Sequence, residues 1–188
     1  MSHPITRIIS AMAPIYDPVI DRFLGDERKV RKRMAERVGD FERGLDIGCG
    51  TGSFLFVLYE RGKGELYGMD LSNRMLSVAS RKHTGAELIR GSALHLPFKD
   101  ASFDAVFSTM MMHHLTCKER EKAIAEVERV LLSGGTYYSL EFDKDGLTGI
   151  GKAVTGLGFL ENSQLSRFEI KDEEQWEKGL VWRELHRK

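Results

Sequence analysis

The sequence predicts an α/β fold whose sheet is mostly parallel and carries helices on both faces. Short apolar runs typical of buried strands alternate along most of the chain with segments whose apolar residues recur at helical spacing. Such alternation implies right-handed crossovers that return each strand parallel to the one before it. Near the C-terminal end the alternation stops, and two strand-like runs follow one another. We therefore expect these last strands to be antiparallel.

The first predicted element is an amphipathic helix over residues 17–38. Asp17 can cap it, and Pro18 occupies a first-turn position where the missing N–H costs nothing. Apolar residues fall on one helical stripe and basic residues fall opposite. The apolar set is Ile20, Phe23, Leu24, Val30, Met34 and Val38, and the basic set is Arg22, Lys29, Lys32 and Arg33. We interpret the basic side as a solvated outer face, with an anion-binding surface as the alternative.

The predicted core follows this helix. Its strands are expected at 44–48, 65–70, 86–91, 103–110 and 136–142, and its helices near 52–61, 73–82, 118–132 and 147–157. The helix near 118–132 has an inward apolar face, and the SGG turn at 133–135 is expected to end it. That face consists of Ile124, Val127, Val130 and Leu131. The last two strands are expected within 164–170 and 179–188.

The bulk composition predicts one ordinary domain, with a helical cap at 1–40 and a core at 41–188. Lys plus Arg and Asp plus Glu number 28 each, so no overall field attracts nucleic acid, and nucleic-acid binding is not expected. No stretch resembles a signal peptide or the ~20 apolar residues of a membrane span. Cys49 and Cys117 form neither a disulfide framework nor a zinc motif. We expect a reduced, cytoplasmic protein.

The strongest chemical signal is LDIGCGTG at residues 45–52, where the first core strand meets a helix. Gly48, Gly50 and Gly52 permit a tight turn and let a ligand approach the backbone. The next strand ends in Asp70, a carboxylate placed to accept hydrogen bonds from ribose hydroxyls. Together, the glycine turn and the strand-end acid predict a site for an adenosine-type ligand.

Asp46 distinguishes between two kinds of adenosine-containing cofactor. A dinucleotide site prefers the spacing G-x-G-x-x-G, whereas this chain has G-x-G-x-G followed by Ser53. A carboxylate would repel a diphosphate, but near the ammonium group of a methionine moiety it is favourable, directly or through water. A glycine turn with an Asp that only caps the helix is the structural alternative.

The sequence resembles the class I S-adenosylmethionine-dependent methyltransferases, in particular the small methyltransferase-domain group that includes quinone-biosynthesis C-methyltransferases. LDIGCGTG is similar to the first motif of that family, and GMD is similar to its ribose-binding acid. GSALHLPFKDASFDAVFS resembles the segment that runs into the fourth strand, and ERVLLSGG resembles the turn into the fifth. The resemblance covers nearly the whole chain. It implies a Rossmann-like sheet of seven strands and S-adenosylmethionine as the cofactor.

The resemblance assigns cofactor contacts to individual residues. At the methionine end and the ribose they are Asp46, Gly48, Cys49, Gly50, Gly52, Asp70 and Thr109, and around the adenine they are Leu71, Met75, Ser92 and Ala93. Ser92 departs from the family, which commonly has Asp there. A hydroxyl accepts a hydrogen bond from the adenine amine more weakly than a carboxylate does. Leu132 and Ser133 also depart, replacing a common Lys-Pro at a turn with no chemical role.

The stretch STMMMHHL at 108–115 contains two adjacent histidines. No metal site is expected, because adjacent side chains on so short a stretch cannot converge on one ion. The resemblance implies that one of His113 and His114 points toward the acceptor and the other packs inward. A wall or positioning role is preferred to a catalytic base, since methyl transfer does not require a base. Tyr16 is a further catalytic candidate, because the family's N-terminal segment commonly closes over the cofactor; a surface tyrosine packed on the first helix is the alternative.

The expected activity is methyl transfer from S-adenosylmethionine to a small-molecule or lipid-like acceptor. Little sequence remains for a lid, so the acceptor pocket is expected to be open or completed by a second copy in a homodimer. The basic helix is compatible with peripheral contact with a membrane. The alternatives are an NAD-dependent oxidoreductase and a non-catalytic partner protein. A rise in melting temperature with NADH alone, or a stable hetero-oligomer without cofactor affinity, would favour these alternatives.

Overall fold

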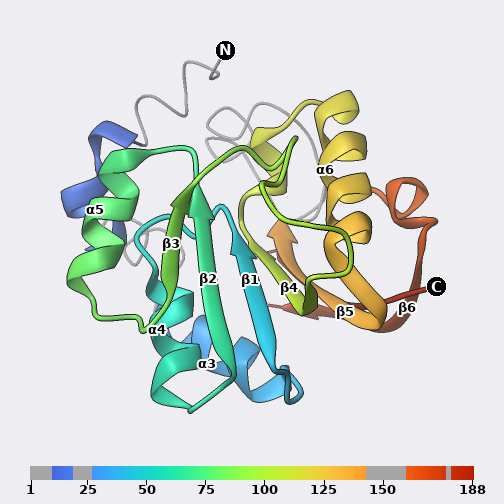
Figure 1. Ribbon diagram of the computed structural model, residues 1–188, viewed down its shortest axis with the longest axis horizontal. Coiled ribbons are helices and arrows are strands. Elements are labelled where there is room, and N and C mark those ends of the chain that lie inside the picture. Colours follow the sequence, from blue (N-terminus) through green and yellow to red (C-terminus); the bar gives the residue numbers. More distant parts are fainter. Residues whose placement is uncertain (1–9, 19–26, 143–159, 177–178) are drawn as a thin grey trace.

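The computed structural model describes residues 10–18, 27–142, 160–176 and 179–188, and a seven-stranded sheet forms its centre (Figure 1). The strands are β1 Arg43–Ile47, β2 Glu65–Asp70, β3 Glu87–Arg90, β4 Phe103–Thr109, β5 Leu131–Phe142, β6 Phe168–Trp176 and β7 Leu180–Arg187. The helices are α3 Glu27–Arg37, α4 Ser53–Glu60, α5 Asn73–Arg81 and α6 Cys117–Val130, with short 3-10 helices η1 Ala13–Ile15, η2 Met112–His114 and η3 Asn162–Leu165. The strand order is β3-β2-β1-β4-β5-β7-β6.

Strand direction confirms the predicted fold class. The strands β3, β2, β1, β4 and β5 are parallel to one another, and β7 runs antiparallel to both β5 and β6. β2 has the predicted bounds, and the bounds of β1, β3 and β4 lie within one residue of the predicted ends. The apolar periodicity of the sequence is therefore sufficient to locate the parallel strands β1 to β4.

Helices bury the two faces of the sheet separately. Met34 of α3 and Leu55 of α4 belong to one apolar cluster, and Ile124 and Val127 of α6 belong to the other. Successive strand side chains point to opposite faces, so Leu45 and Ile47 of β1 join the α6 cluster. Full burial of a side chain of this size contributes about 1.5–3 kcal/mol. The same alternation turns Asp46 toward the face that α3 and α4 cover.

The prediction that the SGG turn ends the core helix expected near 118–132 is wrong. α6 ends at Val130, and β5 begins at Leu131, whose dihedral angles are already extended at φ −71° and ψ 140°. Leu131 is fully buried and pairs with Phe103 of β4, so strand pairing outweighs the glycine stop signal. The SGG residues lie within β5, next to the point where its register with β4 shifts.

The predicted N-terminal helix is described only at its two ends. Residues 16–18 are helical, and α3 covers the second part of the predicted range. Residues 19–26, with Ile20, Arg22, Phe23 and Leu24, lie outside the described residues, as does the helix predicted at 147–157.

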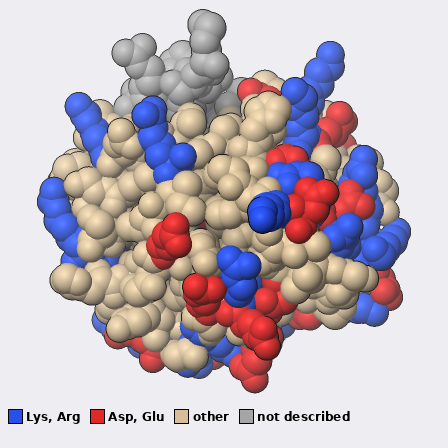
Figure 2. All heavy atoms as spheres, viewed as in Figure 1, with Lys and Arg blue, Asp and Glu red and all other residues tan. Residues whose placement is uncertain are grey.

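The basic side of α3 is partly paired with the acidic strand β6. Arg33 Nη2 lies 2.8 Å from Glu174 Oε1, and Arg37 Nη1 lies 2.8 Å from Asp172 Oδ2. Such exposed pairs contribute about 0–1 kcal/mol each, so they orient the helix more than they stabilise it. This part of the predicted solvated face therefore contacts the sheet. Elsewhere on the surface, Figure 2 shows basic and acidic side chains intermixed beside a broad uncharged area. Among the described residues, no helix is both long and apolar enough to cross a membrane.

Candidate functional site

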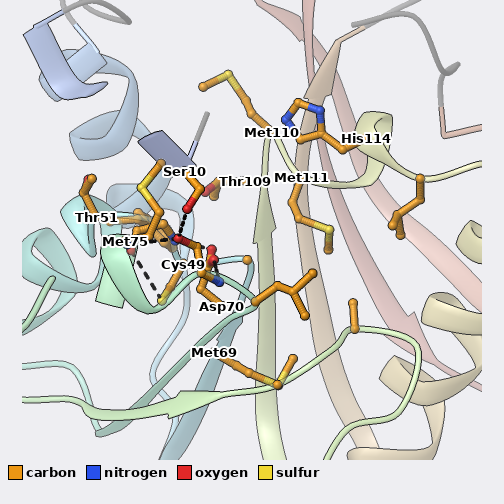
Figure 3. A pocket seen from close by; sticks show the side chains of 18 of the residues that line it. Ser10, Cys49, Thr51, Met69, Asp70, Met75, Thr109, Met110, Met111 and His114 are labelled. Carbon is orange, nitrogen blue, oxygen red and sulfur yellow. Dashed lines mark hydrogen bonds between the residues drawn. The ribbon is translucent and has the colours of Figure 1, made fainter. Parts of the chain in front are cut away.

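A cavity of about 760 Å³ opens at the carboxyl ends of β1, β2 and β4 (Figure 3). Parallel sheets bind ligands at this edge, next to the strand where the order changes direction, which here is β1. The volume lies within the range of about 300–1,000 Å³ that ligand pockets span. The predicted site residues that line it are Tyr16, Gly48, Cys49, Gly50, Asp70, Leu71, Met75, Ser92, Ala93, Thr109 and His114. Asp46, Gly52 and His113 lie outside its wall.

Backbone hydrogen bonds and one carboxylate hold the glycine loop against β2. The N–H groups of Gly48 and Cys49 donate to the carbonyl oxygen of Met69 at 2.7 and 3.0 Å. Asp70 accepts from Gly50 N–H at 3.0 Å through Oδ2, and from Ser72 N–H at 2.7 Å through Oδ1. Burial raises the pKa of Asp70, against these hydrogen bonds. Asp70 therefore organises the loop, and its carboxylate retains acceptor sites for a ligand hydroxyl.

The three glycines of the loop serve different purposes, although all have a positive φ. A Cβ atom at Gly48 would lie 2.3 Å from Met111 Cγ, and one at Gly52 would lie 2.9 Å from Cβ of Ala79 in α5. A Cβ atom at Gly50 would meet no heavy atom within 4 Å. Gly48 and Gly52 thus allow close packing within the protein, and Gly50 leaves open space at the cavity wall.

Asp46 is completely buried below this loop. Its exposed fraction is 0%, and neither carboxylate oxygen has a hydrogen-bond donor among the described residues. Desolvation raises its pKa to about 8; the positive charge of Arg31 acts in the opposite direction, and the charge of Asp70 adds to the rise. A buried carboxylate without donors is unfavourable, so a cationic group placed nearby would be complementary to it.

Side chains predicted to surround an adenine line one end of the cavity. Met75 is buried in α5, whereas Leu71 is 49% exposed. Ser92 and Ala93 follow β3, and the Ser92 hydroxyl accepts the N–H of Leu94 at 3.3 Å. The donor N–H of Leu94 occupies one lone pair of that hydroxyl, which leaves it a weak acceptor for a ligand amine.

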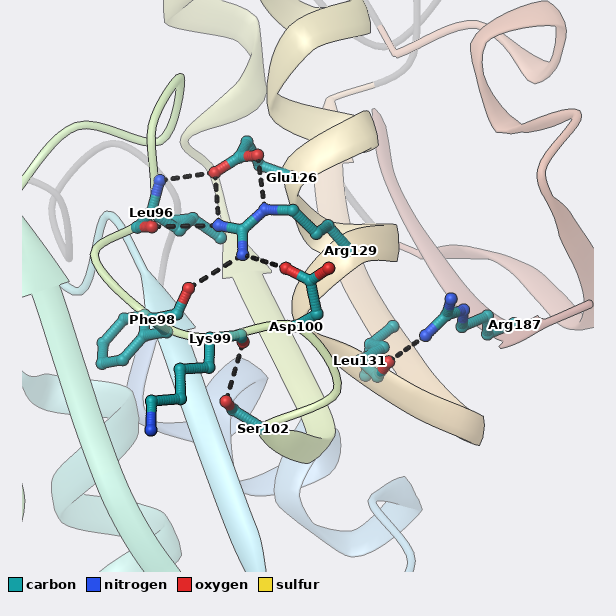
Figure 4. A network of polar contacts seen from close by, with 9 residues as sticks. All are labelled: Leu96, Phe98, Lys99, Asp100, Ser102, Glu126, Arg129, Leu131 and Arg187. Atoms are coloured by element: carbon teal, nitrogen blue, oxygen red, sulfur yellow. Dashed lines mark hydrogen bonds and ion pairs between the residues drawn. The ribbon is translucent and has the colours of Figure 1, made fainter.

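Arg129 of α6 holds the loop that carries these residues (Figure 4). Its guanidinium donates to the carbonyl oxygens of Leu96 and Phe98 at 3.0 and 2.8 Å. It also contacts the carboxylates of Glu126 and Asp100, and Glu126 in turn accepts the N–H of Leu96 at 2.7 Å. The sequence does not predict this network, although Arg129 lies within the ERVLLSGG segment.

The turn after β4 forms the opposite wall of the cavity. In Figure 3, Met110, Met111 and His114 lie across from Cys49 and Asp70 of the glycine loop side. Met110 has a φ of +51°, which is uncommon for a residue with a side chain. Its N–H donates to the carbonyl oxygen of Leu140 at 2.7 Å. The chain therefore leaves β4 through a sharp turn that is fixed to β5.

The two histidines of this turn point in different directions. His114 lines the cavity, whereas His113 is only 4% exposed and its Nδ1 lies 2.9 Å from Glu141 Oε2. One histidine therefore lines the cavity and the other packs inward, and an acceptor-side role for the first stays a prediction. The described residues contain no group of three or more His, Cys, Asp or Glu side chains that could hold a metal ion.

The N-terminal segment is joined to the glycine loop by Asp17, which was predicted only as a helix cap. Asp17 Oδ1 accepts from Thr51 Oγ1 at 2.6 Å, and Asp17 Oδ2 lies 2.5 Å from Lys82 Nζ. Burial raises the pKa of Asp17, but hydrogen bonds from Lys82 and Thr51 outweigh burial and leave that pKa below its ordinary value. Ser10 also contacts Ser72 at 2.5 Å between hydroxyl oxygens. These contacts place Tyr16 in the cavity wall.

Several further wall residues are not among the predicted site residues. They are Ser10, Val30, Arg31, Met34, Thr51, Arg90, Glu119 and Leu140. Val30, Arg31 and Met34 share α3, whereas the others come from the N-terminal segment, the glycine loop, β3, α6 and β5, and only the fold brings these parts together. Arg31 lies in the predicted amphipathic helix, but nothing local distinguishes it there from the other basic residues.

Comparison with known proteins shows that this chain is similar to methyltransferases. Residues 45–139 match the family model described as "Methyltransferase domain". A 2-phytyl-1,4-beta-naphthoquinone methyltransferase of Arabidopsis thaliana is 32% identical over 150 residues, which cover 73% of this chain and 57% of the relative. A demethylmenaquinone methyltransferase of Thermus thermophilus is 36% identical over 144 residues, which cover 72% of this chain and 64% of the relative. The chain thus spans about three-fifths of the length of these relatives.

Solved structures share the fold. A Thermotoga maritima protein described as an S-adenosylmethionine-dependent methyltransferase and possible histamine N-methyltransferase superposes with a TM-score of 0.75. The superposition covers 98% of this chain and all of the other, at 20% identity. A Haloferax volcanii methyltransferase complex with the activator Trm112 gives a TM-score of 0.72 at 17% identity, over 95% of this chain and 97% of that one.

Proposed function

Since the chain belongs to the class I S-adenosylmethionine-dependent methyltransferases, we propose that it methylates a small, quinone-type acceptor. The observation that carries the proposal is the single cavity with two unlike walls. One wall holds the glycine loop and Asp70, and the other holds the Met110–His114 turn. A donor and an acceptor bound against these walls would share the same cavity.

The donor-side residues fit S-adenosylmethionine. Asp46 offers a buried carboxylate without hydrogen-bond donors among the described residues, which complements the positive charge of the methionine ammonium. Gly50 leaves open space where a side chain would otherwise project, and Asp70 offers acceptor sites for ribose hydroxyls. Leu71, Met75, Ser92 and Ala93 would flank the adenine, and Cys49 and Thr109 would complete the wall near the methionine end. Gly52 would act indirectly, through its packing on α5.

The chain's task in this reaction is alignment and exclusion of water. When bound, S-adenosylmethionine supplies a methyl group that is already activated by a positively charged sulfur. Holding the acceptor in line with that group supplies most of the rate advantage. His114 would form part of the wall that orients the acceptor, and Tyr16 would close the cavity from the N-terminal side. His113 would act through its contact with His114, whose ring centroid is 4.0 Å away.

The acceptor wall favours an apolar, ring-containing molecule. Met110, Met111 and Leu140 contribute apolar surface, and methionine adapts to irregular shapes. The names of the Arabidopsis and Thermus relatives both specify naphthoquinone-type acceptors. A lipid-like acceptor of this type would bring the protein to a membrane surface. Cytoplasmic location, peripheral membrane contact and a homodimer stay predictions.

Calorimetry followed by a methylation assay tests the proposal. S-adenosylhomocysteine and NADH are titrated separately into the purified chain, and binding of the first alone is expected. Tritiated S-adenosylmethionine is then supplied with a reduced, demethylated naphthoquinol that carries a short isoprenoid chain, or with unmodified tRNA. Label is expected in the quinol only. Binding of NADH alone would support the oxidoreductase alternative, and label in tRNA alone would overturn the acceptor class.

A further inference from the structure

Glu141 of β5 is a buried carboxylate whose side-chain hydrogen bonds, among the described residues, all go to the turn after β4. Its exposed fraction is 1%. Oε1 accepts the backbone N–H groups of Met111 and Met112 at 2.9 and 2.8 Å, and Oε2 lies 2.9 Å from His113 Nδ1. Three consecutive residues are thus fixed by one side chain from another strand.

The turn held by Glu141 needs support from outside. Met110 occupies a positive φ, a backbone state that persists only when surrounding contacts hold it. Leu140 accepts the N–H of Met110, and its neighbour Glu141 accepts the next two N–H groups. Without the carboxylate, two backbone donors would lose their partners, and that of Met112 is buried. The turn would then have to rearrange.

A change in this turn would reach the cavity by two contacts. Met111 packs against Gly48 so closely that a Cβ atom there would lie 2.3 Å from Met111 Cγ. The ring of His113 lies 4.0 Å from the ring of His114, centroid to centroid, and His114 lines the cavity. Glu141 itself lies outside the cavity wall.

We propose that Glu141 is a positioning residue of the acceptor site, which fixes the turn at 110–114 and thereby orients Met111 and His114. This inference rests on the proposed function for the identity of the acceptor wall. The donor side, formed by the glycine loop and Asp70, has its own backbone hydrogen bonds to β2 and, among the described residues, makes no hydrogen bond with the Glu141 side chain. Loss of Glu141 is therefore expected to affect acceptor use more than cofactor affinity.

The test compares Glu141→Leu with Glu141→Gln. Leucine removes the acceptor atoms, whereas glutamine keeps one oxygen for the two backbone N–H groups. Glu141→Leu is expected to raise the KM for the short-chain naphthoquinol at least tenfold and to change the Kd of S-adenosylhomocysteine less than twofold. Glu141→Gln is expected to restore most of the acceptor KM. Should Glu141→Leu not fold, Glu141→Asp, whose shorter side chain cannot span the same contacts, replaces it.

Hydrogen exchange provides a readout that does not depend on activity. The amides of Met111 and Met112 are expected to exchange at least tenfold faster in Glu141→Leu than in Glu141→Gln. If wild-type protein does not methylate the quinol, the proposed acceptor fails, and exchange still decides whether Glu141 holds the turn. Equal exchange in both variants would overturn the inference.

A matched control separates positioning from general stability. Glu173→Gln breaks the ion pair between Glu173 of β6 and Arg183 of β7, whose atoms are 2.6 Å apart, and neither side chain hydrogen-bonds to the turn. This control is expected to leave the acceptor KM unchanged. A rise in KM equal to that of Glu141→Leu, or an equal loss of S-adenosylhomocysteine affinity in Glu141→Leu, would overturn the assignment.

Discussion

Two buried carboxylates lie beneath opposite walls of the cavity, and the protein treats them differently. Glu141 accepts two backbone N–H groups and contacts His113, whereas Asp46 has no donor among the described residues. A carboxylate with donors rigidifies the structure around it, and one without donors costs stability. The comparison indicates that the carboxylate beneath the turn after β4 already has its hydrogen-bond partners within the protein. It also indicates that β1, beneath the glycine loop, holds a buried carboxyl group whose ionised form a cationic ligand would favour.

The largest expected effect concerns the pH dependence of stability at Asp46. In the unfolded chain this carboxyl ionises near pH 4, whereas burial raises its folded-state pKa to about 8. Between these two pH values the folded protein keeps a proton that the unfolded chain has lost. The free energy of unfolding is therefore highest, with respect to this group, below about pH 4, and it falls as the pH rises toward 8. The upper bound of that loss is about 5 kcal/mol.

Asp46→Asn removes this titration. The melting temperature of the ligand-free protein is expected to fall more steeply between pH 5 and 8 for wild type than for the variant. Parallel curves would show that Asp46 is not the unsatisfied carboxylate that the comparison requires.

The contact between the two walls is tested at Gly48. Gly48→Ala combines a positive φ with a Cβ atom 2.3 Å from Met111 Cγ, and a loss of about 2–3 kcal/mol of unfolding free energy is expected. Gly50→Ala is the matched control, because its Cβ atom meets nothing within 4 Å. It should cost only about 1–2 kcal/mol in urea unfolding, and calorimetry should show weaker S-adenosylhomocysteine binding. Equal stability losses would mean that the walls are not packed against each other.

A smaller effect is expected on the donor side at Asp70. Asp70→Ala removes the acceptor for the Gly50 and Ser72 N–H groups and the proposed ribose contact. S-adenosylhomocysteine affinity should fall by about 1–3 kcal/mol, measured by calorimetry. Glu65→Ala, which breaks an exposed ion pair with Arg43 at the start of β2, the end opposite Asp70, serves as the control. Unchanged affinity of the Asp70 variant would remove the ribose assignment.

The smallest effect is expected at His114. If His114 only orients the acceptor, His114→Ala should slow methyl transfer about tenfold and leave cofactor affinity nearly unchanged. Loss of a general base would slow the reaction more, by about 10²–10⁴-fold. Single-turnover rates measure this directly. A fall in rate well beyond tenfold would assign proton transfer to His114 instead. Weakened S-adenosylhomocysteine binding would place His114 on the donor side.

The sequence predicts those parts of the molecule that depend on local pattern. The bounds of β2 and the positions of Gly48, Gly50 and Asp70 follow from apolar periodicity and from turns that need glycine. The α6–β5 boundary does not, because Leu131 is placed by pairing with Phe103, far away in the chain. A local stop signal carries no information about that partner.

The same distinction applies within the site. Asp17, Arg129 and Glu141 each act on a segment more than 25 residues away, through Thr51, Leu96 and Met111 respectively. In the sequence they are an ordinary helix cap, a surface-like arginine and an acid within an apolar strand. Their roles depend on tertiary contacts that only the structure supplies. The family resemblance implies that one of the two adjacent histidines packs inward, but only the contact between His113 and Glu141 shows which of them does so.

The hydrogen bonds from Arg129 to the loop after β3 affect which substitutions the cavity can tolerate. Two of its contacts are to the carbonyl oxygens of Leu96 and Phe98, which every amino acid carries. Side chains along this loop can therefore be exchanged over evolutionary time without loss of those bonds, and the specificity of this end of the cavity can diverge while its framework persists. Arg129 has no such freedom, since lysine cannot reproduce its planar fork of donors.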